Sequence, residues 1–114
     1  MSQYHYMFVH KGKKTEVFMG WDRPLQGFFL VIDQGGEEPL WSNLDQEVSH
    51  PNSLTPFLVE LNNRGINAPE SMISELLEDQ RQNVGNKNVV YWSGGRVECN
   101  QGVSNFNELC EKFL

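Results

Sequence analysis

The hydrophobic pattern of this chain changes its period once, near residue 50, and that change limits the folds open to it. Up to residue 43, large residues alternate with others or form a short apolar run, which is typical of strands. From residue 54 to residue 85, apolar residues recur at helical spacing. Strands followed by helices predict an α+β domain, in which helices cover one side of an antiparallel sheet.

Four strands are predicted in the first part of the chain. Residues 4–9 and 15–21 alternate on either side of Gly12, which predicts a hairpin. Residues 27–32 lack alternation, which favours a central strand covered on both faces. Residues 39–43 favour a short edge strand, since they begin with a proline. The connections are too short for crossovers, so we expect an antiparallel meander rather than a parallel sheet.

Two helices are predicted after a polar loop at residues 45–53. In the first, Thr55 is expected as the N-cap, Pro56 as the first helical residue and Gly65 just past the end. In the second, Asn67 and Glu70 have the spacing of a capping box. Its predicted apolar stripe consists of Met72, Ile73, Leu76 and Leu77.

The end of the chain predicts a short β-hairpin and a final helix. Gly94 and Gly95 lie between two β-favouring runs in residues 88–100, as in a two-residue hairpin turn. Residues 105–113 carry apolar residues on one helical stripe. The predicted fold is therefore a β-meander, a two-helix hairpin, a short β-hairpin and a C-terminal helix.

Length and composition favour one domain over residues 1–114. The longest apolar run, Phe28–Ile32, is far shorter than the ~20 residues of a membrane span. The N-terminus lacks the pattern of a signal peptide, so we expect a cytoplasmic protein without membrane contact. In that compartment Cys99 and Cys110 are expected to be free, buried thiols.

Charge is unevenly distributed along the chain, whose net charge is −6. Residues 33–79 contain ten acidic residues and a single basic one, Arg64, a local balance of −9. This distribution makes nucleic acid an unfavourable ligand, because phosphates attract lysine and arginine. The acids either keep helix faces and turns solvated or face a basic partner.

No motif in the sequence specifies a reaction. The residues that most often ligate metals are His5, His10, His50, Cys99 and Cys110. They show no HxH, HExxH or CxxC spacing. Ser93 lacks the G-x-S-x-G pattern of a nucleophile elbow, and the glycine clusters lack phosphate-binding patterns. We therefore expect no catalytic residue, no metal and no cofactor.

The aromatic residues at strand ends are the remaining candidates for a binding site. Trp21, Trp41 and Trp92 either pack in the core or line a binding face beside the acidic segment. Asp22 and Arg23 precede Pro24 and are expected to form a turn, although a turn does not require the arginine.

These residues lead to three hypotheses. The first is a non-catalytic protein-interaction or accessory domain with an acidic surface, whose protein partner is unidentified. The second is a small enzyme with a site at Asp22 and Arg23, joined by His50 or Asp45. A variant of the first is a nucleic-acid mimic, in which carboxylates occupy the basic groove of a partner protein. The third is RNA or DNA binding through the N-terminal hairpin, with Lys11, Lys13, Lys14, Tyr4 and Tyr6.

Several phrases of the sequence resemble a known group of proteins. GWDRPLQGFFLVI, SNLD, PESMISELLED and NVGN resemble segments of small uncharacterised proteins of proteobacteria, some of them carried on plasmids and integrated elements. The resemblance runs from residue 4 to about residue 90 and implies no chemistry. It implies an accessory role in the life of a mobile element, including the binding of a host protein.

Overall fold

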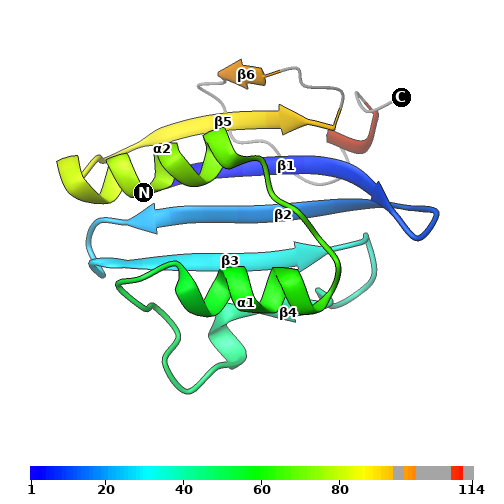
Figure 1. Cartoon of the computed structure of the whole chain (residues 1–114), viewed down its shortest axis with the longest axis horizontal. Coiled ribbons are helices and arrows are strands. Elements are labelled where there is room, and N and C mark those ends of the chain that lie inside the picture. Colours follow the sequence, from blue (N-terminus) through cyan, green and yellow to red (C-terminus); the bar gives the residue numbers. More distant parts are fainter. Residues whose placement is uncertain (94–96, 100–108, 112–114) are drawn as a thin grey trace.

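The computed structural model describes residues 1–93, 97–99 and 109–111 (Figure 1). The strands are β1 (Ser2–His10), β2 (Lys13–Asp22), β3 (Gly27–Asp33), β4 (Trp41–Ser42), β5 (Lys87–Trp92) and β6 (Val97–Cys99). The helices are a 3-10 helix η1 (Asn43–Asp45), α1 (Thr55–Asn63) and α2 (Glu70–Gln82). The strands form one sheet in the order β4-β3-β2-β1-β5-β6, and both α-helices lie on the same face of it. The α+β class, with a meander followed by helices, is confirmed.

The meander from β1 to β4 is antiparallel throughout, as the sequence predicts. Lys11 and Gly12 form the first turn with φ angles of 52° and 80°. Positive φ at both central positions matches the twist of a two-residue hairpin, so the turn predicted at Gly12 is confirmed.

The sheet is mixed, because β5 pairs with β1 in parallel. The expectation of a purely antiparallel sheet is therefore wrong. It considered only the short connections between the first four strands, whereas residues 43–86 are long enough to cross the sheet. This segment carries α1 and α2 over one face and returns the chain to β1 in the same direction.

Helix α1 begins one position away from the predicted cap. Leu54 is the N-cap, and the Thr55 backbone N–H donates instead to Ser53 Oγ at 3.2 Å. The predicted end is confirmed, since Gly65 follows the helix with a φ of 72°. The Ile66 N–H donates to the Leu61 carbonyl at 2.9 Å, so this end is a Schellman motif.

Helix α2 differs from its prediction in its N-cap and in its buried stripe. Pro69 occupies the N-cap position and no side chain caps the helix, so the capping box expected from Asn67 is wrong. Met72 and Leu76 are fully buried, but Leu77 is 48% exposed and Asp79 takes the next buried position. The buried stripe thus ends on a carboxylate, which the apolar pattern did not include.

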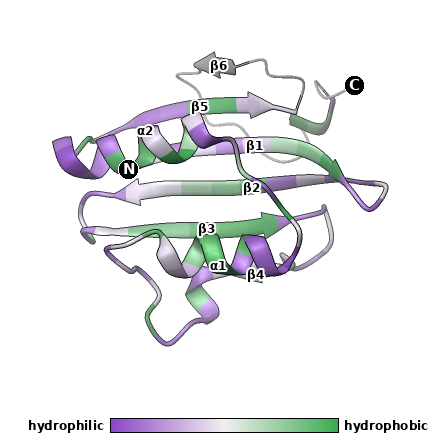
Figure 2. Cartoon of the chain, in the orientation of Figure 1, coloured by the Kyte–Doolittle hydropathy of each residue, from purple (hydrophilic) through white to green (hydrophobic). Residues whose placement is uncertain are grey.

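Two hydrophobic clusters lie on opposite faces of the sheet. The cluster under the helices includes Tyr4, Val17, Met19, Phe28, Leu30, Ile32, Phe57, Leu61, Met72 and Leu76. Figure 2 shows that β3 is hydrophobic over most of its length and that the C-terminal end of α2 is hydrophilic. The second cluster comprises Met7, Val90, Trp92 and Leu109.

The last predicted elements fall partly outside the described residues. β5 and β6 pair antiparallel, which confirms a hairpin, but its Gly94-Gly95 turn lies outside. Residues 109–111 are helical, and the rest of the predicted final helix lies outside as well. Within the described ranges, no helix has the length and hydropathy needed to cross a membrane.

The outer edge of β3 is closed by a two-residue strand and by the loop that follows it. Beyond β4, the Leu30 N–H donates to Asn43 Oδ1 at 3.3 Å and the Phe28 N–H donates to the Pro51 carbonyl at 2.8 Å. Asn43 is buried and its Nδ2 donates to the Ser49 carbonyl at 2.8 Å. Loop 43–51 is therefore fixed to the sheet by hydrogen bonds.

Gly27 should be essential for this closure. A Cβ at Gly27 would overlap the His50 backbone carbonyl, so Gly27→Ala must displace either the loop or β3. We expect Gly27→Ala to lower the free energy of unfolding by about 2–3 kcal/mol in urea titrations. Gly36→Ala is the matched control, because its nearest contact would be an ordinary 3.6 Å to Glu38. Equal stability of the two variants would contradict the close approach.

Candidate functional site

The three tryptophans do not form a common aromatic face. Trp21 is 2% exposed in the cluster under the helices, and Trp92 is 5% exposed in the cluster on the opposite face. Trp41 is half-buried, with its ring 5.8 Å from that of Phe57. Of the two readings that the sequence left open, packing in the core is the one that fits these positions.

Asp22 and Arg23 form the turn between β2 and β3. The buried Asp22 carboxylate accepts the Leu25 N–H at 3.2 Å, and the Gln26 N–H donates to the Arg23 carbonyl at 3.2 Å. The exposed Arg23 guanidinium lies over Gly85, where an added Cβ would be 3.2 Å from Nη1. The Asp22 carboxylate is thus engaged in holding the turn.

The other two members of the hypothetical enzyme site lie in loop 43–51. Asp45 is exposed in η1, whereas the His50 ring contacts Asn43 and Ser49. No hydrogen bond or ion pair within the described ranges links either residue to Asp22. Within the described part of the chain, no hydrogen bond or ion pair therefore joins the four residues, although His50 packs against Gly27, the strand partner of Asp22.

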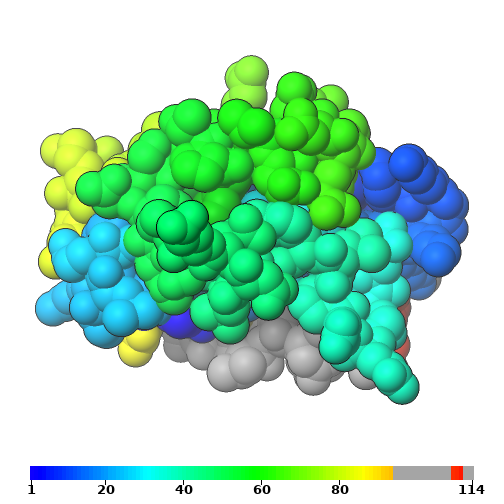
Figure 3. All heavy atoms as spheres, turned by 90° about the horizontal axis from the view of Figure 1, so that it is seen from below, coloured from blue at the N-terminus to red at the C-terminus, as the bar shows by residue number. Residues whose placement is uncertain are grey.

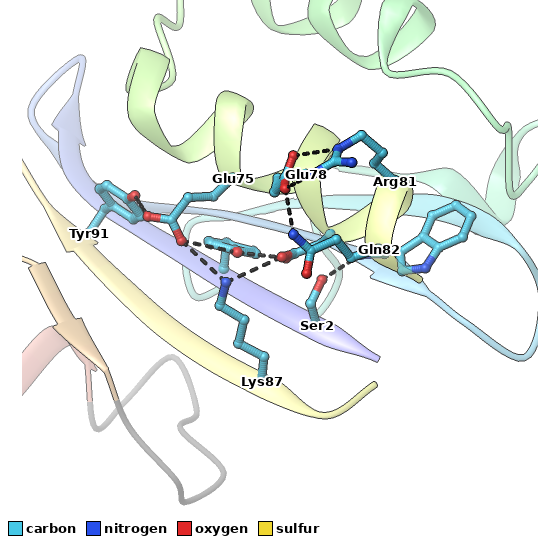
Figure 4. Close-up of polar contacts among 10 residues, drawn as sticks. Ser2, Glu75, Glu78, Arg81, Gln82, Lys87 and Tyr91 are labelled. Atoms are coloured by element: carbon cyan, nitrogen blue, oxygen red, sulfur yellow. Dashed lines mark hydrogen bonds and ion pairs between the residues drawn. The ribbon is translucent and has the colours of Figure 1, made fainter. Parts of the chain in front are cut away.

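A polar cluster between α2 and the sheet escaped the sequence analysis (Figure 4). We define the α2 polar cluster as Tyr4, Glu75, Asp79, Lys87 and Tyr91. The Tyr4 hydroxyl donates to Asp79 Oδ2 at 2.6 Å and to Glu75 Oε2 at 3.2 Å, and the Tyr91 hydroxyl donates to Glu75 Oε1 at 2.8 Å. Lys87 Nζ lies 3.2 Å from Asp79 Oδ1 and 3.4 Å from Glu75 Oε2.

The electrostatics of this cluster keep the Tyr4 hydroxyl protonated and the Lys87 ammonium group charged. Burial, followed by the hydrogen bond to Asp79, raises the pKa of Tyr4 far above its usual range. Burial opposes the charge on Lys87, but the hydrogen bond and attraction to Asp79 outweigh it and raise the Lys87 pKa. Each carboxylate oxygen of Glu75 and Asp79 accepts a donor from Tyr4, Tyr91 or Lys87. The role of the cluster is to fasten α2 to β1 and β5.

One signal in the sequence pointed to this cluster. Asp79 follows Leu76 by three positions and Met72 by seven, so it falls on the apolar stripe of α2. The adjacent Glu78 masks this signal, because two neighbouring acids are typical of the polar side of a helix. Only Glu78 is exposed, where hydrogen bonds from Arg81 and Gln82 lower its pKa to about 2.

A second candidate is a surface that combines carboxylates with exposed apolar side chains. We define the acidic loop surface as residues 34–53 together with α1. Its large exposed apolar residues are Leu40, Leu44, Val48, Leu58 and Val59. Its exposed acids are Glu37, Glu38, Asp45 and Glu47. These residues include no lysine or arginine, and Lys11, Lys13 and Arg64 adjoin the surface only at Gln34, Leu40 and Asn63.

The loop and the helix form one continuous face. Figure 3, which views the molecule from the β4 side, shows the loop directly beside α1. The Trp41 ring packs on the ring of Phe57 in α1, and this contact joins the loop to the helix. Of the described residues, none forms an ion pair or side-chain hydrogen bond with the carboxylate of Glu37, Glu38, Asp45 or Glu47. The negative charge of this face is thus unneutralised.

Metal coordination and a reactive thiol are two further kinds of site. Within residues 1–93, 97–99 and 109–111, no three His, Cys, Asp or Glu side chains gather where they could hold a metal ion. Cys110 is a free thiol, and burial raises its pKa. A catalytic cysteine requires the opposite shift, toward the thiolate.

Comparisons with family models, with curated proteins and with solved structures found no match to this chain.

The Tyr4–Asp79 hydrogen bond should make the fold sensitive to alkaline pH. Because the folded state raises the Tyr4 pKa, its contribution is complete below the ordinary tyrosine pKa of about 10 and declines at higher pH. The raised pKa of Lys87 acts in the same direction. Tyr4→Phe should flatten the loss of stability between pH 9 and pH 11, in urea titrations at about half-unit steps.

The same variant should be less stable at neutral pH. Removing the hydroxyl leaves buried Asp79 without its shortest hydrogen bond, at a cost of about 1–3 kcal/mol. Tyr6→Phe serves as control, because no carboxylate of a described residue accepts the Tyr6 hydroxyl. If both variants matched the wild type at neutral pH, Tyr4 would not be fastening α2.

Proposed function

We propose that this chain is a small, cytoplasmic, non-catalytic interaction domain that binds a protein partner through the acidic loop surface. The partner would present lysine or arginine residues around an apolar patch. One observation carries the proposal, namely that five large exposed apolar residues and four unneutralised carboxylates share one face without a basic residue. Contiguous exposed apolar groups on a small protein mark an interaction site more often than scattered ones do.

The two kinds of side chain have different tasks in this binding mode. Burying an exposed leucine or valine against a partner contributes affinity in proportion to the apolar area removed from water. Carboxylates at the rim attract a basic partner over several ångströms and exclude acidic competitors. Leu44 and Val48 are 71% and 66% exposed, which makes them the strongest candidates for the centre of the contact.

The surface is also organised before a partner arrives. Asn43 and Pro51 hydrogen-bond to β3 on either side of the exposed segment 44–48. A loop held at both ends loses less conformational entropy on binding than a free one.

Two alternatives have weaker support. An enzyme site at Asp22 and Arg23 would need a free carboxylate, but that of Asp22 holds the turn. A nucleic-acid mimic would need carboxylates spaced like phosphates, whereas apolar residues interrupt the acids of this face, and Asp79 is buried. Mimicry remains a special case of the proposal, in which the partner is a nucleic-acid-binding protein.

The resemblance to small proteobacterial proteins of plasmids and integrated elements supplies a setting. A mobile element gains from small proteins that bind and redirect proteins of its host. We propose this accessory role for the chain, with the host protein bound at the acidic loop surface.

A site-specific cross-link tests the proposal. A photoreactive residue at position 44 should trap one protein in lysates of the native cells, whereas the same residue at Leu77 on α2 should not. With the purified partner, Leu44→Ser/Val48→Ser should weaken binding at least about tenfold by calorimetry, because two central apolar contacts are lost. Asp45→Lys/Glu47→Lys should weaken it most at low salt.

Glu70→Lys is the matched charge control, since Glu70 is exposed in the first turn of α2, outside the acidic loop surface. Its affinity should equal that of the wild type. Cross-linking at position 77 alone, or equal binding by the variants at positions 44 and 48, would contradict the proposal.

A further inference from the structure

A cavity of about 450 Å³ lies at the far end of the sheet from the turn between β2 and β3. The β1–β2 turn, the residues after β3 and the end of α1 meet there, at the right of Figure 1. Its volume falls within the range of small-molecule sites in proteins. Three of its lining residues, Gln34, Leu40 and Asn63, also belong to the acidic loop surface, but the proposed centre of protein binding lies at Leu44 and Val48.

The residues that line the cavity carry positive charge, whereas the net charge of the chain is negative. His10, Lys11, Lys13 and Arg64 line it, and none of its lining residues is acidic. The protein has a net charge of −6, with nine lysines and arginines in total. Three of these nine thus face one cavity, beside a histidine that gains charge on protonation.

The positive charges are largely available to a ligand. The ammonium groups of Lys11 and Lys13 form no ion pair or hydrogen bond with any residue in the described part of the chain. Arg64 uses Nε to bind Glu60 Oε2 at 2.6 Å, and its side chain remains 32% exposed. Glu60 and the carbonyl end of α1 reduce the local potential by about one and a half charges. Three permanent positive charges exceed that reduction.

The turn conformation places one of these lysines at the cavity. Lys11 has a φ of 52°, in a hairpin position that favours asparagine or glycine. A lysine there carries a backbone cost that its own hydrogen bonds do not explain. The neighbouring Lys13 belongs to β2, on the sheet face that the helices cover.

The uncharged residues that line the cavity suit the organic part of a ligand that carries an anionic group. Gln34 and Asn63 bring side-chain amides, and Ile66 brings a buried apolar surface. Guanidinium and ammonium groups together favour a phosphate, which offers several oxygens and up to two negative charges. We propose that this cavity binds a small organic phosphate, with Lys11, Lys13 and Arg64 holding the phosphoryl group.

Adenosine monophosphate is a suitable probe. Calorimetry at about 50 mM salt should detect binding of adenosine monophosphate and, more weakly, of inorganic phosphate, with both weakened at higher salt. Adenosine should not bind. Lys11→Ala/Lys13→Ala should reduce the affinity at least about tenfold, because two charge-assisted hydrogen bonds are lost.

Lys14→Ala is the matched control. Lys14 follows Lys13 directly, but its Nζ donates to the Cys110 carbonyl at 3.0 Å, on the other face of the sheet. This variant should keep wild-type affinity, and thermal melting of both variants checks that they fold. Absence of binding by both phosphates would overturn the proposal. So would equal affinity for adenosine, or equal losses in the Lys14 variant and the Lys11/Lys13 variant.

Discussion

β1 is hydrogen-bonded along both of its edges, and much of the architecture follows from that pairing. β2 reaches one edge through a two-residue turn, but the other edge is filled by a strand that begins 77 positions after the end of β1. To bring β5 there, the chain must cross the sheet from its β4 side. The crossing segment becomes the helical layer, and its second helix brings Glu75 and Asp79 to the Tyr4 hydroxyl and to Lys87 of β5. Core burial and the polar cluster therefore both depend on the parallel β1–β5 pair.

The parts of the fold that sequence predicted are those set by neighbouring residues. Alternation gave the first two strands, Gly12 gave their turn, and Gly65 gave the end of α1, because each depends on local conformation. The direction of β5 depends on how residues 43–86 pass over the sheet, which no local pattern encodes. The predicted N-caps of both helices were also wrong. Ser53 accepts the Thr55 N–H in front of α1, and Pro69 takes the N-cap position of α2, so Thr55 and Asn67 do not cap these helices.

Candidate sites were harder to predict than elements, for a similar reason. The tryptophans were candidates for a binding face because of their residue type. Their burial instead depends on which face of each strand lies toward the core. The acidic segment was visible in the sequence, but its division into a buried Asp79 and an exposed loop required the position of α2. The cavity lined by Lys11, Lys13 and Arg64 brings together residues about fifty positions apart, from the β1–β2 turn and from the end of α1. The composition of the chain therefore gives no indication of it.

The closure of the β3 edge separates the residues that hold the loop from the residues that it displays. Asn43 and Pro51 accept hydrogen bonds from the backbone N–H groups of β3. The side chains at positions 44–48 take no part in these hydrogen bonds and are exposed. Substitutions in this short segment leave the sheet edge covered and its hydrogen bonds intact. Under the proposed function, partner specificity is thus free to change over evolution at little cost to folding, and without reopening an edge to aggregation.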